Sequence, residues 1–262
     1  SSAVFASPDA TLEEAQAEKY DRICRRLGIG PGHRVLEIGT GWGGFALHAS
    51  QRRGAHVTTT TISREQHAWA ADRFAKSAAP ERVELLFQDY RDLAGTYDRL
   101  VSIEMIEAVG HEYLDGYLRV CSDRLAHDGA MSIQAIVIGD QSYEAARRHV
   151  DFIKQYIFPG GCLPSISRIA DGVARETDLR ICALEDITAH YAETLRRWRA
   201  RFDAAEPELR ALGCGDALLR TWRYYLSYCE AGFEERHISC VQMDLVKPGW
   251  RPQGPLSTPS AG

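Results

Sequence analysis

Short apolar runs alternate with longer amphipathic stretches along the first half of the chain. The runs have the length of strands and are rich in branched and apolar residues, which favours buried strands at 33–39, 55–62, 82–88, 97–103 and 130–138. Helical patterns are expected between them, at 43–53, 64–78 and 111–129. Strands that alternate with helices in this way are typical of a parallel sheet with helices on both faces.

Two of these helices have recognisable ends. Ser63 is followed three residues later by Gln66, which is the spacing of a capping box at the start of helix 64–78. Gly129 is expected to end helix 111–129, because glycine readily adopts the left-handed conformation that follows many helices.

The pattern changes after Asp140, where helical segments and a Pro/Gly loop replace the regular alternation. The segments expected here are helices at 141–157 and 189–230, a loop at 158–165, and strands at 179–186 and 237–246. We therefore expect one domain over residues 1–248, with helical cap insertions within 139–230 that cover the top of the sheet. The remaining residues, 249–262, are rich in Pro, Gly and Ser and are expected to form a flexible tail.

Composition narrows the classes of function. A formal net charge of −5 over 262 residues argues against a general nucleic-acid surface, and the arginine run at 196–201 is interpreted as a solvated helix face. Seven scattered cysteines without a C-x-x-C pair argue against a disulfide framework and a thiolate zinc site, and no metal is expected. No signal peptide or membrane span is recognisable, which predicts a cytoplasmic protein, with peripheral contact to the inner membrane left open.

A glycine-rich turn follows the first strand in "VLEIGTGWGGFA", and its glycines fit two kinds of site. Gly39, Gly41 and Gly44 match G-x-G-x-x-G, which would hold the pyrophosphate of a dinucleotide. Read as Glu37-x-Gly39-x-Gly41-x-Gly43, the same turn suits the uncharged sulfonium nucleoside S-adenosylmethionine.

The residues at the ends of the second and third strands favour S-adenosylmethionine as the ligand. A dinucleotide site normally has a carboxylate at the end of the second strand, and this strand ends in Thr61-Ile62 instead. Gln66 could bind the ribose hydroxyls from the next helix, while Asp89 and Tyr90 suit the edge and the ring of adenine. The carboxylate of Glu37 would lie beside a pyrophosphate, where a negative charge is unfavourable.

Several blocks of the sequence resemble the cyclopropane-fatty-acyl-phospholipid synthase family, in the branch shared by plant and some bacterial enzymes. They are "VLEIGTGWGGFA", "TISREQ", "DYRDL", "YDRLVSIEMIEAVGHEYLDGY", "DFIKQYIFPGGCLPS", "HYAETLRRWRARF" and "YYLSYCEAGF". The resemblance implies an α/β fold with a doubly wound, mostly parallel, seven-stranded Rossmann-like methyltransferase sheet, an antiparallel last strand and a helical cap insertion. The donor-binding residues expected are Glu37, Gly39, Gly41, Trp42, Gly43, Thr61, Ile62, Gln66, Asp89, Tyr90 and Glu104.

The resemblance also implies a reaction. The methyl group of S-adenosylmethionine is attacked by a cis alkene of an acyl chain, and a bound bicarbonate removes a proton from the resulting cation as the cyclopropane closes. The cation requires a pocket that excludes water. The residues expected at this step are Glu107, Tyr191, the backbone of Ile136, Gln134 where most relatives carry His, and Ser2 where most carry Cys. The partners implied are an unsaturated acyl lipid or another alkene-bearing small molecule, and a second copy in a homodimer.

Other interpretations stay open. The same scaffold suits a C- or N-methyltransferase of a small metabolite, or a nucleoside-binding module without catalysis. The chain opens inside the family pattern, so the N-terminal domain of many relatives is either missing or trimmed, and its absence would make a soluble or carrier-linked acceptor more credible. Glu104 fits a ligand contact and a structural pairing equally well, whereas the amide of Gln134 within an apolar strand must reach a site or a polar network.

Overall fold

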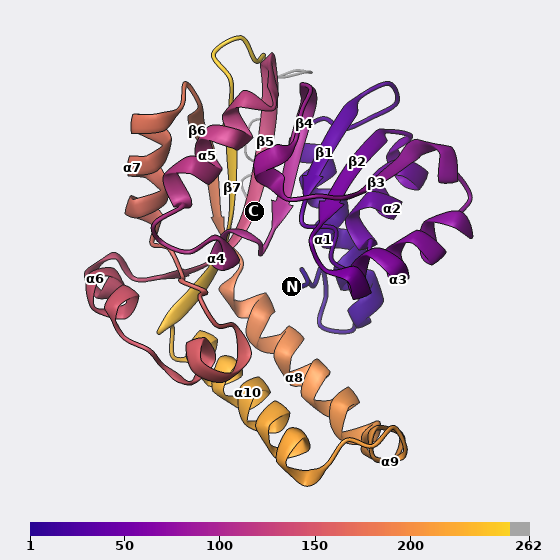
Figure 1. Ribbon diagram of the computed structural model, residues 1–262, viewed down its shortest axis with the longest axis vertical. Helices are drawn as coiled ribbons and strands as arrows, with labels where there is room; N and C mark the ends of the chain where they lie inside the picture. Colours follow the sequence, from indigo (N-terminus) through magenta and orange to yellow (C-terminus); the bar gives the residue numbers. More distant parts are fainter. Residues whose placement is uncertain (252–262) are drawn as a thin grey trace.

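The computed structural model describes residues 1–251, and its centre is a seven-stranded sheet (Figure 1). The strands lie in the order β3-β2-β1-β4-β5-β7-β6. Neighbouring strands from β3 to β5 pair in parallel, whereas β7 runs antiparallel to both β5 and β6, which confirms the predicted sheet. The strands are β1 (Arg34–Ile38), β2 (His56–Thr61), β3 (Val83–Phe87), β4 (Tyr97–Ile103), β5 (Leu125–Ile138), β6 (Arg180–Asp186) and β7 (Ile238–Val246).

Helices cover both faces of the sheet and form two apolar cores. On one face the helices are α1 (Leu12–Arg26), α2 (Gly44–Arg53) and α3 (Arg64–Ala75), and on the other they are α5 (Leu114–Asp123) and α7 (Ile166–Glu176). In the inner strands, residues that point to opposite faces of the sheet enter opposite cores. In β1, for example, Val35 packs with α1 and α2, while Leu36 packs with α5.

The helical cap expected above the strand ends is present. It consists of α4 (Ile106–Val109), α6 (Asp140–Arg148), a π-helical turn (Ile153–Ile157), α8 (Thr188–Ala204), α9 (Glu206–Ala211) and α10 (Asp216–Glu234). Helices α8 and α10 pack side by side and extend away from the sheet as an arm (Figure 1). Within residues 1–251, no helix combines the length and apolar character needed to cross a membrane.

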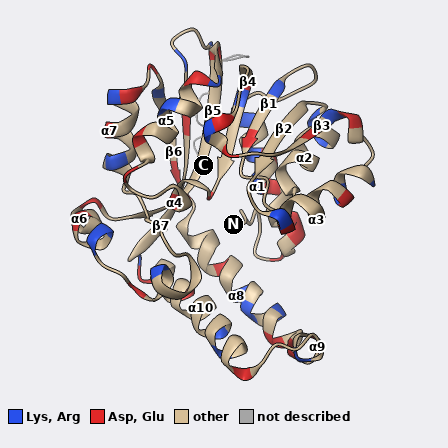
Figure 2. Ribbon diagram, in the orientation of Figure 1, with Lys and Arg blue, Asp and Glu red and all other residues tan. Residues whose placement is uncertain are grey.

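The arginine run of α8 is neutralised by acidic neighbours. Arg196 and Arg199 both pair with Glu230 of α10, and Arg201 pairs with Glu13 at the start of α1. Basic and acidic residues therefore both lie along the arm (Figure 2), as the interpretation of this run as a helix face predicts.

The sequence prediction was wrong at the end of α5. The helix ends at Asp123 with Arg124 as its cap, and β5 begins at Leu125, so Gly129 lies inside a strand. The pairing of β5 with β4 shifts between Leu125 and Ala130, and the glycine lies in this irregularity. A side chain there would meet the carbonyl oxygen of Ala126 at 3.0 Å.

Two helices and part of the tail also differ from expectation. Neither α1 nor α7 was predicted, because charged residues interrupt the apolar pattern of both helices. Of the predicted tail, Trp250 packs against the core beside α1 and α2, whereas residues 252–262 lie outside the described residues.

The turn between β1 and α2 requires glycine at alternate positions. Gly39, Gly41 and Gly43 have φ angles of 100°, 52° and 81°, a left-handed region that other residues rarely adopt. A Cβ atom on Gly43 would lie 2.6 Å from the ring of Phe74 in α3, so this glycine also permits close packing of α3.

We expect Gly43→Ala to destabilise the protein by roughly 1–3 kcal/mol, because it adds both backbone strain and a steric clash. The matched control is Gly116→Ala in the exposed face of α5, where a Cβ would meet nothing within 4 Å. That control should stabilise the protein by up to about 1 kcal/mol, since alanine favours helix. Urea unfolding of both variants tests this, and equal effects would contradict it.

Candidate active site

The predicted site residues gather at the carboxyl ends of the parallel strands. The chain winds outward in one direction from β1 through β2 to β3, and in the other direction from β4 to β5, so the order reverses between β1 and β4. Ligands of open α/β sheets bind outside this switch point. The N-terminal residues lie here as well, between the ends of the strands and the start of α8 (Figure 1).

Glu37 is buried within β1, two residues before the first glycine of the turn. Its Oε2 accepts a hydrogen bond from the Thr59 hydroxyl at 2.6 Å, and Thr59 in turn bonds to the Thr40 hydroxyl at 2.8 Å. Burial raises the pKa of Glu37 to about 8, against the opposing effects of Thr59 and Lys19. Glu37 therefore ties the glycine turn to β2 as a largely protonated acid at neutral pH.

Residues predicted for the ribose and adenine follow β2 and β3. The Thr61 hydroxyl donates to Gln66 Oε1 at 2.9 Å, which holds Gln66 beside the end of β2. Ser63 accepts from the Gln66 amide, so only one half of the predicted capping box forms. At the end of β3, both oxygens of Asp89 accept from the Arg91 guanidinium, and the ring of Tyr90 packs edge-on against Tyr117 at 5.4 Å.

Exposed apolar side chains surround the glycine turn. Trp42 is 56% exposed and meets the ring of Trp69 edge-on at 6.0 Å, while Ile62 is 70% exposed. Exposed apolar groups of this size commonly mark a binding surface. The expected donor-binding residues thus follow four adjacent strands, β3, β2, β1 and β4, in one row.

Glu104 is the central acceptor of the site. It follows β4 with a φ angle of 52°, an unusual conformation for a residue with a side chain, and it is held there by a hydrogen bond from its amide to the Gln134 carbonyl. Its Oε1 accepts from the Ser2 amide and from Gln134 Nε2, each at 2.8 Å. Its Oε2 accepts from the Tyr191 hydroxyl at 2.6 Å. Three donors directed at one carboxylate favour its ionised form.

Glu107 lies beside this centre with a different environment. Its Oε1 accepts from the backbone amide of Ile136, while its Oε2 is buried and has no hydrogen-bond partner among residues 1–251. Burial and the nearby Glu104 raise the pKa of Glu107 to about 8. Two neighbouring carboxyls are thus held in different protonation states, which is a common arrangement in active sites.

The five residues predicted for the chemical step come together, but around an unexpected group. Ser2, Gln134 and Tyr191 all donate to Glu104, and Ile136 donates to Glu107. Ser2 contributes its main-chain amide, because its hydroxyl donates to the Ala3 carbonyl instead.

Lys19 was missed by the sequence reasoning. It is fully buried in α1, its Nζ donates to the Ser1 hydroxyl at 2.7 Å, and its charge acts on both Glu104 and Glu37. Burial lowers the pKa of Lys19 to about 8, although these carboxyls oppose the shift. The signal in the sequence was its spacing: Ala15, Lys19 and Ile23 recur every fourth residue on the buried side of the helix.

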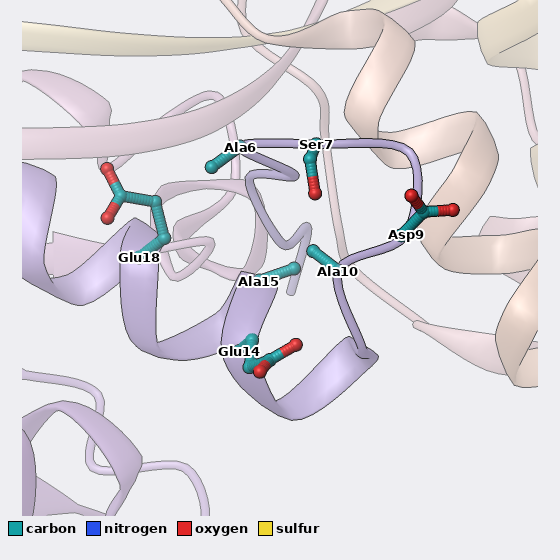
Figure 3. Close-up of a pocket in the computed structure, with 7 residues that line it drawn as sticks. All are labelled: Ala6, Ser7, Asp9, Ala10, Glu14, Ala15 and Glu18. Carbon is teal, nitrogen blue, oxygen red and sulfur yellow. The ribbon is translucent and has the colours of Figure 1, made fainter.

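A hollow elsewhere on the surface is separate from this site. Figure 3 shows it between the loop before α1 and the first turns of that helix, lined by Ala6, Ser7, Asp9, Ala10, Glu14, Ala15 and Glu18. Glu14 completes the capping box with Thr11, and Glu18 pairs with Arg25, so these acids have structural partners.

No group of three His, Cys, Asp or Glu side chains within residues 1–251 has the arrangement of a metal site.

Known proteins resemble the chain over nearly its whole length. The family model for mycolic acid cyclopropane synthetase matches residues 1–243. The chain is 41% identical over 238 residues to tuberculostearic acid methyltransferase UfaA1 of Mycobacterium tuberculosis, covering 91% of this chain and 56% of that protein. It is 37% identical over 233 residues to cyclopropane-fatty-acyl-phospholipid synthase of Escherichia coli K12, covering 88% of this chain and 58% of that protein. The chain thus spans less than two thirds of the length of these relatives.

A solved structure extends the similarity to the fold. Mycolic acid cyclopropane synthase CmaA1, complexed with SAH and CTAB, superposes with a TM-score of 0.87 at 29% identity, over 94% of this chain and 89% of that one. The same score relates this chain to the cyclopropane synthase MmaA2 of Mycobacterium tuberculosis, at 27% identity and the same coverage. Together with the site at the strand ends, these similarities show that the chain belongs to the mycolic acid cyclopropane synthetase family.

Proposed function

We propose that this protein transfers the methyl group of S-adenosylmethionine to a carbon–carbon double bond of an unsaturated acyl chain, and that the carboxylate of Glu104 is the base of the reaction. The observation that supports this role most strongly is the convergence of Ser2, Gln134 and Tyr191 on that carboxylate. The relatives named as a cyclopropane-fatty-acyl-phospholipid synthase and a tuberculostearic acid methyltransferase support the class of substrate.

The residues expected to hold bicarbonate do not fit a separate anion here. The donors from Gln134, Tyr191 and the chain at Ser2 are already engaged by Glu104, and a second anion beside its charge would be repelled. The one expected contact left without a partner among the described residues is Glu107 Oε2. We therefore propose that Glu104 accepts the proton, in the role that the resemblance gives to bicarbonate.

The proposed methyl transfer and ring closure conserve atoms and electrons. When bound, S-adenosylmethionine supplies an electrophilic methyl group on a sulfonium. The π electrons of the acyl double bond form a new bond to that methyl carbon, the sulfur keeps the electron pair of the broken bond, and a cation remains on the acyl chain. Glu104 removes a proton from the new methyl group, and the released electron pair closes the three-membered ring.

Apolar side chains pack around Tyr191 beside the base, where they would limit the access of water to the cation. The ring of Tyr191 stacks on Phe233 with centroids 4.2 Å apart, and Val4 and Leu195 belong to the same buried cluster. A neutral Glu107 adds no further charge to this pocket, so Glu104 remains the anion that faces the cation.

The cap offers an apolar surface for the acyl chain. Tyr156 and Phe158 are 64% and 55% exposed, and Phe158 lies edge-on to Tyr225 of α10 at 6.2 Å. Amphipathic aromatic residues suit contact with a lipid surface. We propose that this side of the cap meets the lipid, as peripheral contact with a membrane would require.

Incubation with methyl-labelled S-adenosylmethionine and vesicles of cis-unsaturated phosphatidylglycerol tests the function and the base together. We expect labelled acyl chains that gain one CH2 and resist hydrogenation, and we expect Glu104→Gln to lower the rate by about 10²–10⁴-fold. The matched control, Glu208→Gln, changes an exposed residue of α9 and should retain the wild-type rate.

Three outcomes would count against parts of this proposal. Full activity of Glu104→Gln, with a rate that rises on adding bicarbonate, would restore bicarbonate as the base. Labelled chains that hydrogenation still alters would show methylation without ring closure. Donor binding without lipid labelling would favour a small-molecule methyltransferase.

Glu107 should also make stability depend on pH. The pKa of Glu107 in the folded protein is about 8, above its value in the unfolded chain. Its contribution to the free energy of unfolding is therefore fully present below the unfolded pKa and is lost as pH rises through the folded pKa. As pH rises from 5 to 8, we expect the free energy of unfolding to fall less steeply in Glu107→Gln than in the wild type, by up to about 1.4 kcal/mol per pH unit. Urea unfolding across this range measures it, and parallel profiles of wild type and variant would contradict it.

A further inference from the structure

A line of buried polar side chains leads from Glu104 across the sheet to α1. Gln134 of β5 lies opposite Gln242 of β7 in the strand register, and Gln242 lies opposite Glu185 of β6. Gln134 and Gln242 are 0% and 1% exposed, and on the same face of the sheet each has one apolar or thiol neighbour and one polar neighbour, Ser132 and Asp244 respectively. Apolar side chains would fill these positions without a hydrogen-bonding requirement, so the amides need an explanation beyond the fold.

The line has a single direction, which the chemistry of arginine sets. Arg26 Nη1 donates to Gln242 Oε1 at 2.8 Å, Gln242 Nε2 donates to Gln134 Oε1 at 2.9 Å, and Gln134 Nε2 donates to Glu104 Oε1 at 2.8 Å. A guanidinium has donors only, so the side of the Gln242 amide that faces it must be the oxygen. Each amide then turns its NH2 group toward the next acceptor, and the last donor meets the carboxylate.

Arg26 is fixed independently of the two amides. Its Nη2 donates to Asp244 Oδ1 at 2.9 Å and its Nη1 also reaches Glu185 Oε2 at 3.1 Å. Asp244 lies two residues beyond Gln242 on the same face of β7, and it is 4% exposed. The ion pair therefore holds the guanidinium where it can orient Gln242.

We infer that Arg26 and Gln242 are positioning residues, which act through Gln134 to keep a hydrogen-bond donor on Oε1 of Glu104. This inference rests on the proposed role of Glu104 as the base. With Oε1 engaged by Gln134 and by the Ser2 amide, the proton from the substrate is received at Oε2, whose partner, the Tyr191 hydroxyl, can rotate.

Reversing the direction of the line tests the inference. Gln242→Glu keeps the size of the side chain and accepts from Arg26, but it has no donor for Gln134. The Gln134 amide should then turn its NH2 group toward position 242 and its oxygen toward Glu104. Gln242→Met removes the link without reversing it, and it decides the question if the first variant does not fold.

We expect Gln242→Glu to lower kcat at least about tenfold with little change in KM for S-adenosylmethionine, and Gln242→Met to have a smaller effect in the same direction. The acidic limb of the pH profile of kcat should move to higher pH in both variants, because loss of a donor raises the pKa of a carboxylate. The titratable groups around Glu104 are the N-terminal ammonium of Ser1, Lys19, Glu107, Tyr191 and Cys240, and all remain in both variants.

Arg22→Met is the matched control. Arg22 also pairs with Glu185 but makes no hydrogen bond to either amide in residues 1–251, so its loss should leave kcat and the pH profile unchanged. A variant at position 242 with wild-type kcat and pH profile would overturn the inference. Equal effects of Arg22→Met and the Gln242 variants would also overturn it, since they would reflect the charge network as a whole.

A measurement without substrate separates this inference from the proposed function. In protein labelled with ¹⁵N-glutamine, the side-chain amide signals of Gln134 should shift in Gln242→Glu and stay in place in Arg22→Met. Shifted signals in an enzyme that labels no acyl chain would uphold the line of hydrogen bonds and reject the function. Unshifted Gln134 signals in Gln242→Glu would overturn the inference whether or not the protein methylates lipid.

Discussion

Burial of the Glu104 carboxylate is the constraint on which the site depends. Its side chain is only 10% exposed, and a carboxylate so far removed from water is costly unless hydrogen bonds replace its hydration. Here the replacements come from distant parts of the chain. Ser2 belongs to the N-terminal segment, Gln134 to β5 and Tyr191 to α8. The cap, the sheet and the first residues are therefore held together at the point where chemistry is proposed.

Two adjacent glutamates serve different purposes because their surroundings differ. Glu104 accepts from three N–H and O–H donors and, at 3.9 Å, from the Cys240 thiol, whereas Glu107 has one backbone donor and an oxygen without a partner among the described residues. The first environment favours a charge, and the second opposes it. This difference matches the single base that the proposed reaction requires.

The sequence predicted the sheet well because its strands are short apolar runs with clear breaks. All seven strands were identified, including the antiparallel last one, and the glycine turn was placed at the end of β1. Helix ends were harder, since Gly129 looks the same whether it ends a helix or accommodates an irregular strand. Helix α1 was missed because charged residues interrupt its apolar pattern, including the buried Lys19.

The sequence named side chains that lie together in the structure, but it did not predict how they are arranged. Motif positions identified Gln134, Tyr191 and Glu107, yet they carried no information on which carboxylate the donors would reach. That depends on the left-handed backbone of Glu104, which turns its side chain toward them, and no pattern in the sequence marks such a conformation.

The hydrogen bond from Ser2 has an evolutionary consequence. The group that reaches Glu104 is the main-chain amide, and every amino acid except proline carries one. Natural drift at this position is therefore limited by the space available to the side chain, not by its chemistry. The site can keep its full set of donors while the residue that supplies one of them changes from lineage to lineage.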